Sequence, residues 1–416
     1  MSEQEWVLIL SLLVVYSVFA AWLGRFSVTG PMVFVLAGAI LGPDALGWFD
    51  VPISATGVER MTEITLALLL FADAATFDLN KARRDPGLPR RLLLIGMPLT
   101  IVVGALMAYG LFPGEGIAFA LLLGVILAPT DAALGLPIFT NPRVPAVIRR
   151  GLNVESGLND GIATPLVTLF IAFTVSEAES IHGSWLRDAL SEIGLAIVVG
   201  TAVGVAGGWL FARAVKKGWT TTTGQQIGNL ALALGAYWAA LSVGGNGFIA
   251  AFVGGLMYGY VTRYQLEEAT EFTEASGTVL STLVWIIFGS ILVGPLIQEF
   301  DIRALVFAVL ALTVARMVPV AICLIGTGLR RDTVLMMGWL GPRGLASVVF
   351  TLIAFEALHE AGQEAHTLVA MAGWTILLSV VLHSISAVPL AAWYARRLES
   401  ATPGAPELAP SAAPAE

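Results

Sequence analysis

The sequence predicts an all-α polytopic membrane protein with about thirteen transmembrane helices and inverted repeats, two of the helices being broken. The first observation is composition: 57% of the 416 residues are hydrophobic, 12% are charged, and the mean hydropathy is +0.83. A soluble domain has roughly 25% charged residues. The second observation is that apolar blocks of about 20 residues, enough to cross a bilayer, recur almost end to end. The third is that polar residues lie deep inside several of these blocks.

Clusters of polar residues, glycine and proline separate the individual spans. Backbone exposed to lipid must satisfy its own hydrogen bonds, so each apolar block is expected to be helical. The spans occupy residues 1–395, and the remaining residues 396–416, rich in proline, alanine and acid, are expected to form a disordered cytoplasmic tail. The expected spans are 6–25, 29–47, 58–77, 90–112, 116–139, 146–175, 187–213, 225–243, 246–262, 271–293, 303–329, 332–356 and 366–395.

The distribution of lysine and arginine predicts the orientation, because these residues favour cytoplasmic loops. Arg60, Arg187 and Arg303 fall in one set of alternate loops, and most of the 22 basic residues fall in the other set. We therefore expect a multi-pass protein of the inner cell membrane with its N-terminus outside and its C-terminus in the cytoplasm. The basic residues on the expected cytoplasmic side are Arg25, Lys81, Arg83, Arg84, Arg90, Arg91, Arg143, Arg149, Arg150, Arg213, Lys216, Lys217, Arg263, Arg330, Arg331, Arg396 and Arg397.

Several function classes are disfavoured by the same composition. The single cysteine, Cys323, allows no intrachain disulfide and no cysteine-rich metal site. No nucleotide-binding or metal motif supports an enzyme, and no cofactor is expected. A run of basic residues typical of nucleic-acid binding is missing from the sequence. These absences direct attention to the polar residues inside the spans.

The stretch NVESGLNDG at 153–161 places Glu155, Ser156, Asn159 and Asp160 within two turns of span six. Span six is expected to enter from the cytoplasm near Arg150, so Asn159 and Asp160 lie about 15 Å into the bilayer, near its midplane. Ionisable groups at this depth are costly and usually belong to a transport pathway or a buried pair. Asp160 is therefore the leading candidate for a functional carboxylate.

Two further spans bring polar groups to a similar depth, and both are interrupted. Span five contains LAPTDAALGLP, in which Pro129 removes a helical hydrogen bond just before Thr130 and Asp131. Span twelve contains WLGPRGLAS, in which Arg343 stands among Gly341, Pro342 and Gly344. Matched interrupted spans indicate a transporter site, and an offset of seven spans makes these two antiparallel, as an inverted repeat requires.

The faces of span six suggest a division of roles. Ser156 and Asp160, four residues apart, share one face and offer oxygen ligands to a small cation. Glu155 and Asn159 share another face about 100° away, from which Glu155 is expected to compensate the fixed charge of Arg343. Arg316 also lies within the bilayer, where it stabilises the surrounding helices or extends its charge toward the interface.

At these residues the sequence resembles the NhaP-type monovalent cation/proton antiporters, a branch of the sodium/proton exchanger family. The matching segments are APTDAALG at 128–135, VESGLNDG at 154–161 and GPRGLASVVF at 341–350. The resemblance covers about residues 6–395 and implies a homodimer, in which a dimerisation domain and a mobile core domain are discontinuous in sequence. It also implies that spans five and twelve cross as broken helices.

The resemblance implies roles for individual residues. Asp160 would bind the cation or the proton, with Ser156 and Thr130 as Na⁺ ligands and Asp131 as a further oxygen. Asn159 would tie span six to the break of span five near Asp131, and Glu155 would form the core salt bridge with Arg343. Asp73 stands where relatives usually carry a glutamate, and its part in ion binding is left open, as is the choice between ligand and helix cap for Asp131.

The expected function is secondary-active Na⁺/H⁺ antiport in pH homeostasis, with both ions competing for Asp160. The Asn159–Asp160 pair is similar to that of electroneutral, one-for-one exchangers. A K⁺/H⁺ antiporter of the same fold is the nearest alternative, because one carboxylate among neutral oxygens fits either ion. The other alternative functions are an ion-coupled symporter of an organic solute and an ion channel. A pH-sensing role for His182, His359, His366 or His383 is also conceivable.

Overall fold

The computed structural model describes residues 3–49, 56–77, 87–179, 185–263, 266–398 and 406–408. The predicted cytoplasmic residues Lys81, Arg83 and Arg84 and the outer-loop residue His182 lie outside these ranges. Every regular element within the described ranges is helical. The elements are α1 Glu3–Gly24, α2 Gly30–Leu41, α3 Thr56–Thr76, α5 Gly87–Arg91, η1 Leu92–Gly96, α6 Met97–Leu111, η2 Pro113–Glu115, α7 Gly116–Ile126, η3 Ala133–Gly135, α8 Leu136–Phe139, α9 Ala146–Glu179, α10 Trp185–Lys216, α11 Thr222–Ser242, α12 Gly247–Thr262, α13 Glu267–Gln298, α14 Ile302–Leu312, α15 Val314–Cys323, α16 Arg331–Trp339, α17 Leu345–Glu360, α18 His366–Leu398 and η4 Pro406–Leu408.

The predicted all-α membrane fold is confirmed. Each expected span overlaps one helix or a series of two or three helical segments. Among the described residues, 7 helical segments are long and apolar enough to cross a membrane, and shorter apolar helices accompany them. The number of membrane crossings stays a prediction.

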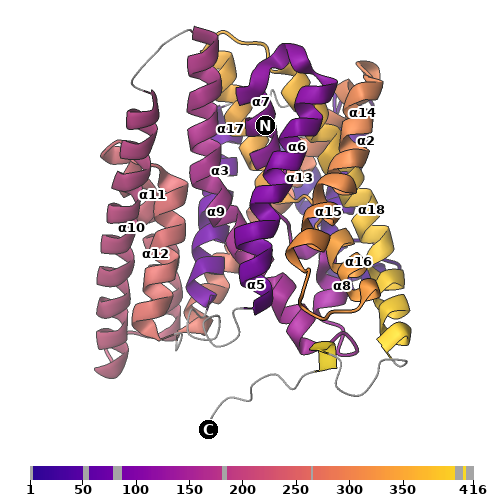
Figure 1. Ribbon diagram of the computed structural model, residues 1–416. Helices are drawn as coiled ribbons and strands as arrows, with labels where there is room; N and C mark the ends of the chain where they lie inside the picture. The colour runs from indigo at the N-terminus through magenta and orange to yellow at the C-terminus, as the bar shows by residue number, and fades with distance from the viewer. Residues whose placement is uncertain are drawn as a thin grey trace.

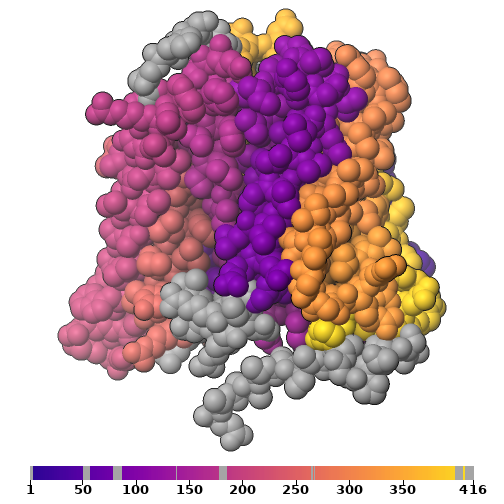
Figure 2. All heavy atoms as spheres, in the orientation of Figure 1, coloured from indigo at the N-terminus to yellow at the C-terminus, as the bar shows by residue number. Residues whose placement is uncertain are grey.

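The helices stand roughly parallel in one bundle (Figure 1). Helices α10, α11 and α12 pack together at one side, and α12 continues the packing onto α3. At the other side, α14 packs against α18. Helix α6 occupies the middle of the face seen in Figure 2, with α14 and α15 packed beside it. The interrupted helices α7 and α17 and the central helix α9 thus lie inside the bundle, where the site is formed.

Two irregularities were not expected from the sequence. Span four contains a π-helical turn, η1, that ends at Gly96, and a Cβ added to this glycine would lie 3.3 Å from the Cys323 sulfur. Span eleven is divided at Thr313 into α14 and α15. This division precedes Arg316 by less than one turn of helix, so it influences the direction from which that side chain enters the core.

The expected disordered tail is partly ordered. Residues 396–398 still belong to α18, and Pro406–Leu408 form a short helical turn. The Glu407 carboxylate is 1% exposed and accepts hydrogen bonds from the Arg330 backbone N–H at 2.7 Å and the Thr333 hydroxyl at 2.9 Å. The expectation of disorder therefore fails for this turn, because a buried acid satisfies free donors at the start of α16. The other tail residues lie outside the described ranges.

Helices α2 and α13 approach each other closely through glycine. A Cβ placed on Gly38 would collide with the Ile286 carbonyl oxygen, and one placed on Gly289 would collide with the Val35 carbonyl oxygen. The two helices therefore pack backbone against backbone, and both positions need a residue without a side chain. Small residues at such contacts are the usual means of close helix packing in membranes.

We expect G38A and G289A each to destabilise the protein by about 1–3 kcal/mol, because a methyl group has no room against the facing carbonyl. The measurement is the unfolding temperature of the purified protein in detergent. G110A is the matched control, since nothing lies within 4 Å of the added atom at that helical glycine. Equal unfolding temperatures for G38A, G289A and G110A would contradict this account of the α2–α13 contact.

Candidate functional site

The two interrupted spans meet at their breaks, as expected for crossed helices. Helix α7 ends at Ile126 before non-helical residues 127–132, and α16 ends at Trp339 before non-helical residues 340–344. The Asp131 backbone N–H donates to the Pro342 carbonyl at 2.9 Å. The Ser347 hydroxyl donates to the Ile126 carbonyl at 2.8 Å. These bonds join two segments that lie more than two hundred residues apart in the chain.

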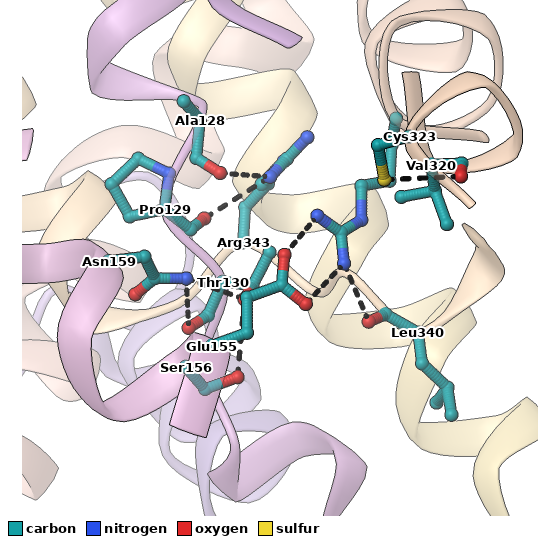
Figure 3. Close-up of polar contacts among 11 residues, drawn as sticks. Ala128, Pro129, Thr130, Glu155, Ser156, Asn159, Val320, Cys323, Leu340 and Arg343 are labelled. Carbon is teal, nitrogen blue, oxygen red and sulfur yellow. Dashed lines mark hydrogen bonds and ion pairs between the residues drawn. The ribbon is translucent and has the colours of Figure 1, made fainter. Parts of the chain in front are cut away.

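Arg343 supplies positive charge to the free carbonyls of the span-five break. Its Nη1 donates to the Ala128 carbonyl at 2.8 Å and to the Pro129 carbonyl at 3.2 Å (Figure 3). The residue is 1% exposed. Carbonyls at the end of a helix lack intrahelical partners and carry partial negative charge, so a fixed cation stabilises them. The guanidinium of Arg343 is thereby bound to backbone oxygens next to Thr130.

Asp131 has the complementary position at the two N-terminal ends. Its Oδ1 accepts from the Ala133 N–H at 2.7 Å, and its Oδ2 accepts from the Leu345 N–H at 3.2 Å at the start of α17. A carboxylate at helix N-termini satisfies free N–H groups and partial positive charge. The geometry therefore supplies the capping contacts considered for Asp131, and they come from both halves of the crossing.

The glycines of the GPRG segment make room for these charged groups. A Cβ on Gly341 would collide with the Arg316 side chain, and a Cβ on Gly344 would collide with the Asp131 carboxylate. The segment thus combines a proline that ends α16, an arginine that binds carbonyls, and two glycines that allow close approach.

The expected salt bridge between Glu155 and Arg343 is wrong. Glu155 pairs instead with Arg316 of α15, through an Nη1–Oε1 distance of 2.6 Å and an Nη2–Oε2 distance of 3.0 Å. Arg316 also reaches the Leu340 carbonyl at 3.4 Å, at the end of α16. The physical reason is that Arg343 is committed to the span-five carbonyls. Figure 3 shows the Glu155 carboxylate turned away from Arg343.

A hydrogen-bond chain links α9 to the span-five break. The Asn159 side-chain amide donates to Thr130 Oγ1 at 2.7 Å and to the Thr130 carbonyl at 3.3 Å. Thr130 Oγ1 lies 3.2 Å from Ser156 Oγ. Since Thr130 Oγ1 accepts from Asn159, its own hydrogen can be donated to Ser156. The contact expected between Asn159 and the break is present, with Thr130 as the partner.

Asp160 lines a cavity of about 1010 Å³ together with the oxygen-bearing side chains Asp73, Thr130, Asp131 and Ser156. The Asp160 side chain is partly exposed and that of Asp73 is exposed, and both contribute to the wall of this cavity. The structure thus brings together all five residues expected to bind the cation or the proton. Carboxylate, hydroxyl and carbonyl oxygens are the ligands that hard cations take in proteins.

The cavity reaches Asp160 from one end of α9. Its wall includes Arg150, Asn153, Ser156 and Asp160 of this helix and no residue beyond Asp160. Arg150 is the sole lysine or arginine among the described lining residues. Within the described part of the chain, no ion pair holds Asp160. The carboxylate is therefore accessible to water from the side predicted to be cytoplasmic, and the described residues place no fixed counter-charge on it.

Sequence reasoning missed two sets of residues. Glu274 and Thr278 of α13 line the same cavity as Asp160, whereas the sequence predicts only a membrane span for their helix. Their spacing of four residues, which places both on one helix face, was the available signal. Ser379 and His383 of α18 contact the backbone of the span-twelve break, and no pattern in the sequence indicated this.

The chain is similar in sequence to known proteins. The family profile described as "Sodium/hydrogen exchanger, transmembrane" matches residues 9–393. The chain is 24% identical to the K⁺/H⁺ antiporter NhaP of Alkalimonas amylolytica over 87% of its own length and 62% of the relative's. It is 25% identical to the Na⁺/H⁺ antiporter ApNhaP of Aphanothece halophytica over 74% of its length and 60% of the relative's. The chain thus spans about three fifths of the length of these two relatives.

A solved structure shares the fold. The sodium proton antiporter MjNhaP1 of Methanocaldococcus jannaschii superposes with a TM-score of 0.74, at 20% sequence identity, over 94% of this chain and 97% of the other. The likeness therefore extends over nearly the whole chain.

We expect a double-mutant cycle on Glu155 and Arg316 to show strong coupling, because removing one member leaves a buried charge without its partner. E155Q and R316M should each cost about 3–5 kcal/mol, and the double variant should be clearly more stable than either. The measurement is the unfolding temperature and the yield of monodisperse protein.

The matched cycle on Glu155 and Arg343 is the control. It should show clearly weaker coupling, because Glu155 is bound to Arg316 and Arg343 to backbone carbonyls, so that only the longer-range attraction between the two charges remains. Strong coupling between Glu155 and Arg343, with none between Glu155 and Arg316, would contradict the pairing seen in the structure.

Proposed function

This chain belongs to the sodium/hydrogen exchanger family, and we propose that it is a secondary-active Na⁺/H⁺ antiporter in which Asp160 binds either ion in turn. The proposed exchange is one cation for one proton. The single observation that supports this function most directly is the Asp160 carboxylate, which has no ion-pair partner among the described residues, is reached by a cavity and lies beside the Thr130 and Ser156 oxygens at the crossing of two broken helices.

Competition for one carboxylate couples the two ions. Na⁺ or H⁺ on Asp160 cancels its charge, whereas an empty carboxylate would have to pass through a dry gate at a cost of several kcal/mol. Only the loaded site therefore changes its exposure from one side of the membrane to the other. This form of alternating access requires the two transported ions and the Asp160 carboxylate, and it requires no cofactor.

The protein environment supports cation exchange over uptake of an organic anion. Arg343 donates to two backbone carbonyls and Arg316 is paired with Glu155, so neither is available to a substrate carboxylate. Among the described residues of the cavity wall, the one basic residue is Arg150, ten residues before Asp160. The cavity instead offers carboxylates from Asp73, Asp131, Asp160 and Glu274, which favour cations.

The choice between Na⁺ and K⁺ needs a direct measurement. One relative is named a K⁺/H⁺ antiporter and another a Na⁺/H⁺ antiporter. We propose Na⁺ as the substrate and retain K⁺ as the alternative of the same mechanism. A fluorescence dequenching assay in proteoliposomes, with Na⁺, Li⁺ and K⁺ added in turn, decides among them. If none of the three ions caused proton movement, the proposed function would be refuted.

The proposal also includes the membrane location and the oligomeric state of the protein. We propose that it lies in the inner cell membrane with the C-terminus in the cytoplasm, on the basis of the basic loops. We also propose a homodimer. Helix α1 is apolar, and Ile9 is its one buried residue, so its surface is available to a second copy.

D160N should abolish cation-dependent proton movement, because a neutral amide cannot exchange a proton for a cation. The variant should still purify as a folded protein, since no ion pair depends on Asp160. The measurement is proteoliposome dequenching together with the unfolding temperature. D188N, which changes an acid in the first turn of α10 outside the cavity, is the control and should transport normally. Retained exchange in D160N would refute the role given to this carboxylate.

One-for-one exchange should be insensitive to membrane voltage, because each cycle moves no net charge. We expect proteoliposomes clamped at about ±100 mV with potassium and valinomycin to give equal initial rates of Na⁺-driven proton movement, although each net charge moved would be worth about 2.3 kcal/mol at that voltage. A rate that changes several-fold with voltage would exclude the electroneutral stoichiometry while leaving antiport itself intact.

A further inference from the structure

Two buried side chains of α18 hold both ends of the span-twelve break. Ser379 Oγ accepts a hydrogen bond from the Arg343 backbone N–H at 2.6 Å. One turn further along α18, His383 Nε2 lies 2.9 Å from the carbonyl oxygen of Trp339, the last residue of α16. Ser379 is 0% exposed and His383 is 2% exposed. The non-helical residues 340–344 are thus attached to α18 at their beginning and near their end.

The hydrogen positions follow from the partners. The Trp339 carbonyl can only accept, so His383 Nε2 carries the hydrogen and donates it. Nδ1 lies 3.1 Å from Ser379 Oγ and 3.0 Å from the Ser379 carbonyl oxygen. Since Ser379 Oγ accepts from Arg343, its hydroxyl hydrogen is free to be donated to Nδ1, which carries no hydrogen in this tautomer and so does not bond the Ser379 carbonyl. A continuous chain therefore runs from the Arg343 backbone through Ser379 and His383 to Trp339.

The same chain leads to the cation site through Arg343. Its backbone is held by α18, while its guanidinium holds the Ala128 and Pro129 carbonyls. Those carbonyls immediately precede Thr130, whose oxygens face the Asn159 amide and the Ser156 hydroxyl. A shift of the Arg343 backbone would therefore move the oxygens beside Asp160. Neither Ser379 nor His383 lines the cavity, so any effect on transport must pass through the backbone of the span-twelve break, which includes Arg343.

We propose that Ser379 and His383 are positioning residues for cation exchange, which fix the span-twelve break and thereby the ligand geometry at Thr130. This inference rests on the proposed function, because its transport readout is exchange itself. The hydrogen bonds, more than the volume of the two side chains, perform the positioning. Buried polar residues in a membrane helix bundle that satisfy backbone groups of a broken helix fit this role.

Substitutions at His383 separate hydrogen bonding from packing. H383L keeps a side chain of similar size and loses the donor to the Trp339 carbonyl. H383Q can place an amide N–H near the position of Nε2 and so restores the donor. S379A removes the acceptor of the Arg343 N–H. S386A is the matched control on the same helix, since Ser386 bonds the Trp339 indole and leaves the backbone of the break untouched.

The kinetic test is the Na⁺ dependence of exchange in proteoliposomes. H383L and S379A should raise the KM for Na⁺ about three- to tenfold, the size expected for one hydrogen bond. H383Q and S386A should stay within about twofold of the parent protein. An unchanged KM in H383L, or an equal rise in H383L and H383Q, would overturn the proposal in favour of simple packing.

A second measurement does not depend on transport. Hydrogen–deuterium exchange of the peptide covering residues 340–345 should be faster in H383L and S379A than in the parent protein, and unchanged in S386A. If the parent protein exchanges no cation while these rates change as expected, the proposed function fails and the attachment of the break to α18 stands. If the parent protein transports and the exchange of this peptide is the same in all variants, the positioning role fails alone.

Discussion

The site depends on one constraint: two interrupted helices leave unpaired backbone groups at the centre of a membrane bundle, and each must be satisfied inside the protein. Arg343 binds the carbonyls of Ala128 and Pro129, while Arg316 binds the carbonyl of Leu340. Asp131 binds N–H groups at the start of both following half-helices. Positive side chains therefore meet the carbonyl ends and a negative side chain meets the N–H ends, so the crossing is neutralised by fixed groups.

This arrangement separates the acids that hold the crossing from the Asp160 carboxylate. Glu155 is bound to Arg316, and Asp131 is occupied by backbone donors. Asp160 lies within the same helix as Glu155 but faces the cavity, and the described residues give it no basic partner. Glu155 and Asp160 are five residues apart, which places the paired acid and the acid of the cavity wall about 140° from each other around the helix. Thr130 and Ser156 complete the polar surface beside it.

The bundle supplies rigid support around this crossing. Helix α18 contacts the span-twelve break through Ser379 and His383, and α9 contacts the span-five break through Asn159. Each break is therefore held by a continuous helix as well as by the other break. At the α2–α13 contact, Gly38 and Gly289 allow backbone packing, which places the polar side chains of α13 beside the cavity. Close packing and polar contacts act together to fix the site.

The sequence by itself determined the helical membrane fold, the two interrupted spans and five of the acidic or hydroxyl residues in the cavity wall, because apolar block length, proline and glycine act locally along the chain. It also placed Ser156 and Asp160 on one face of a helix. Only the tertiary structure decided which arginine pairs with Glu155. Arg316 and Arg343 have the same charge and are both expected in the bilayer, and their partners depend on which broken helix end each one reaches. The same reason hid the ordered Glu407 turn and the contacts of His383, which join segments distant in sequence.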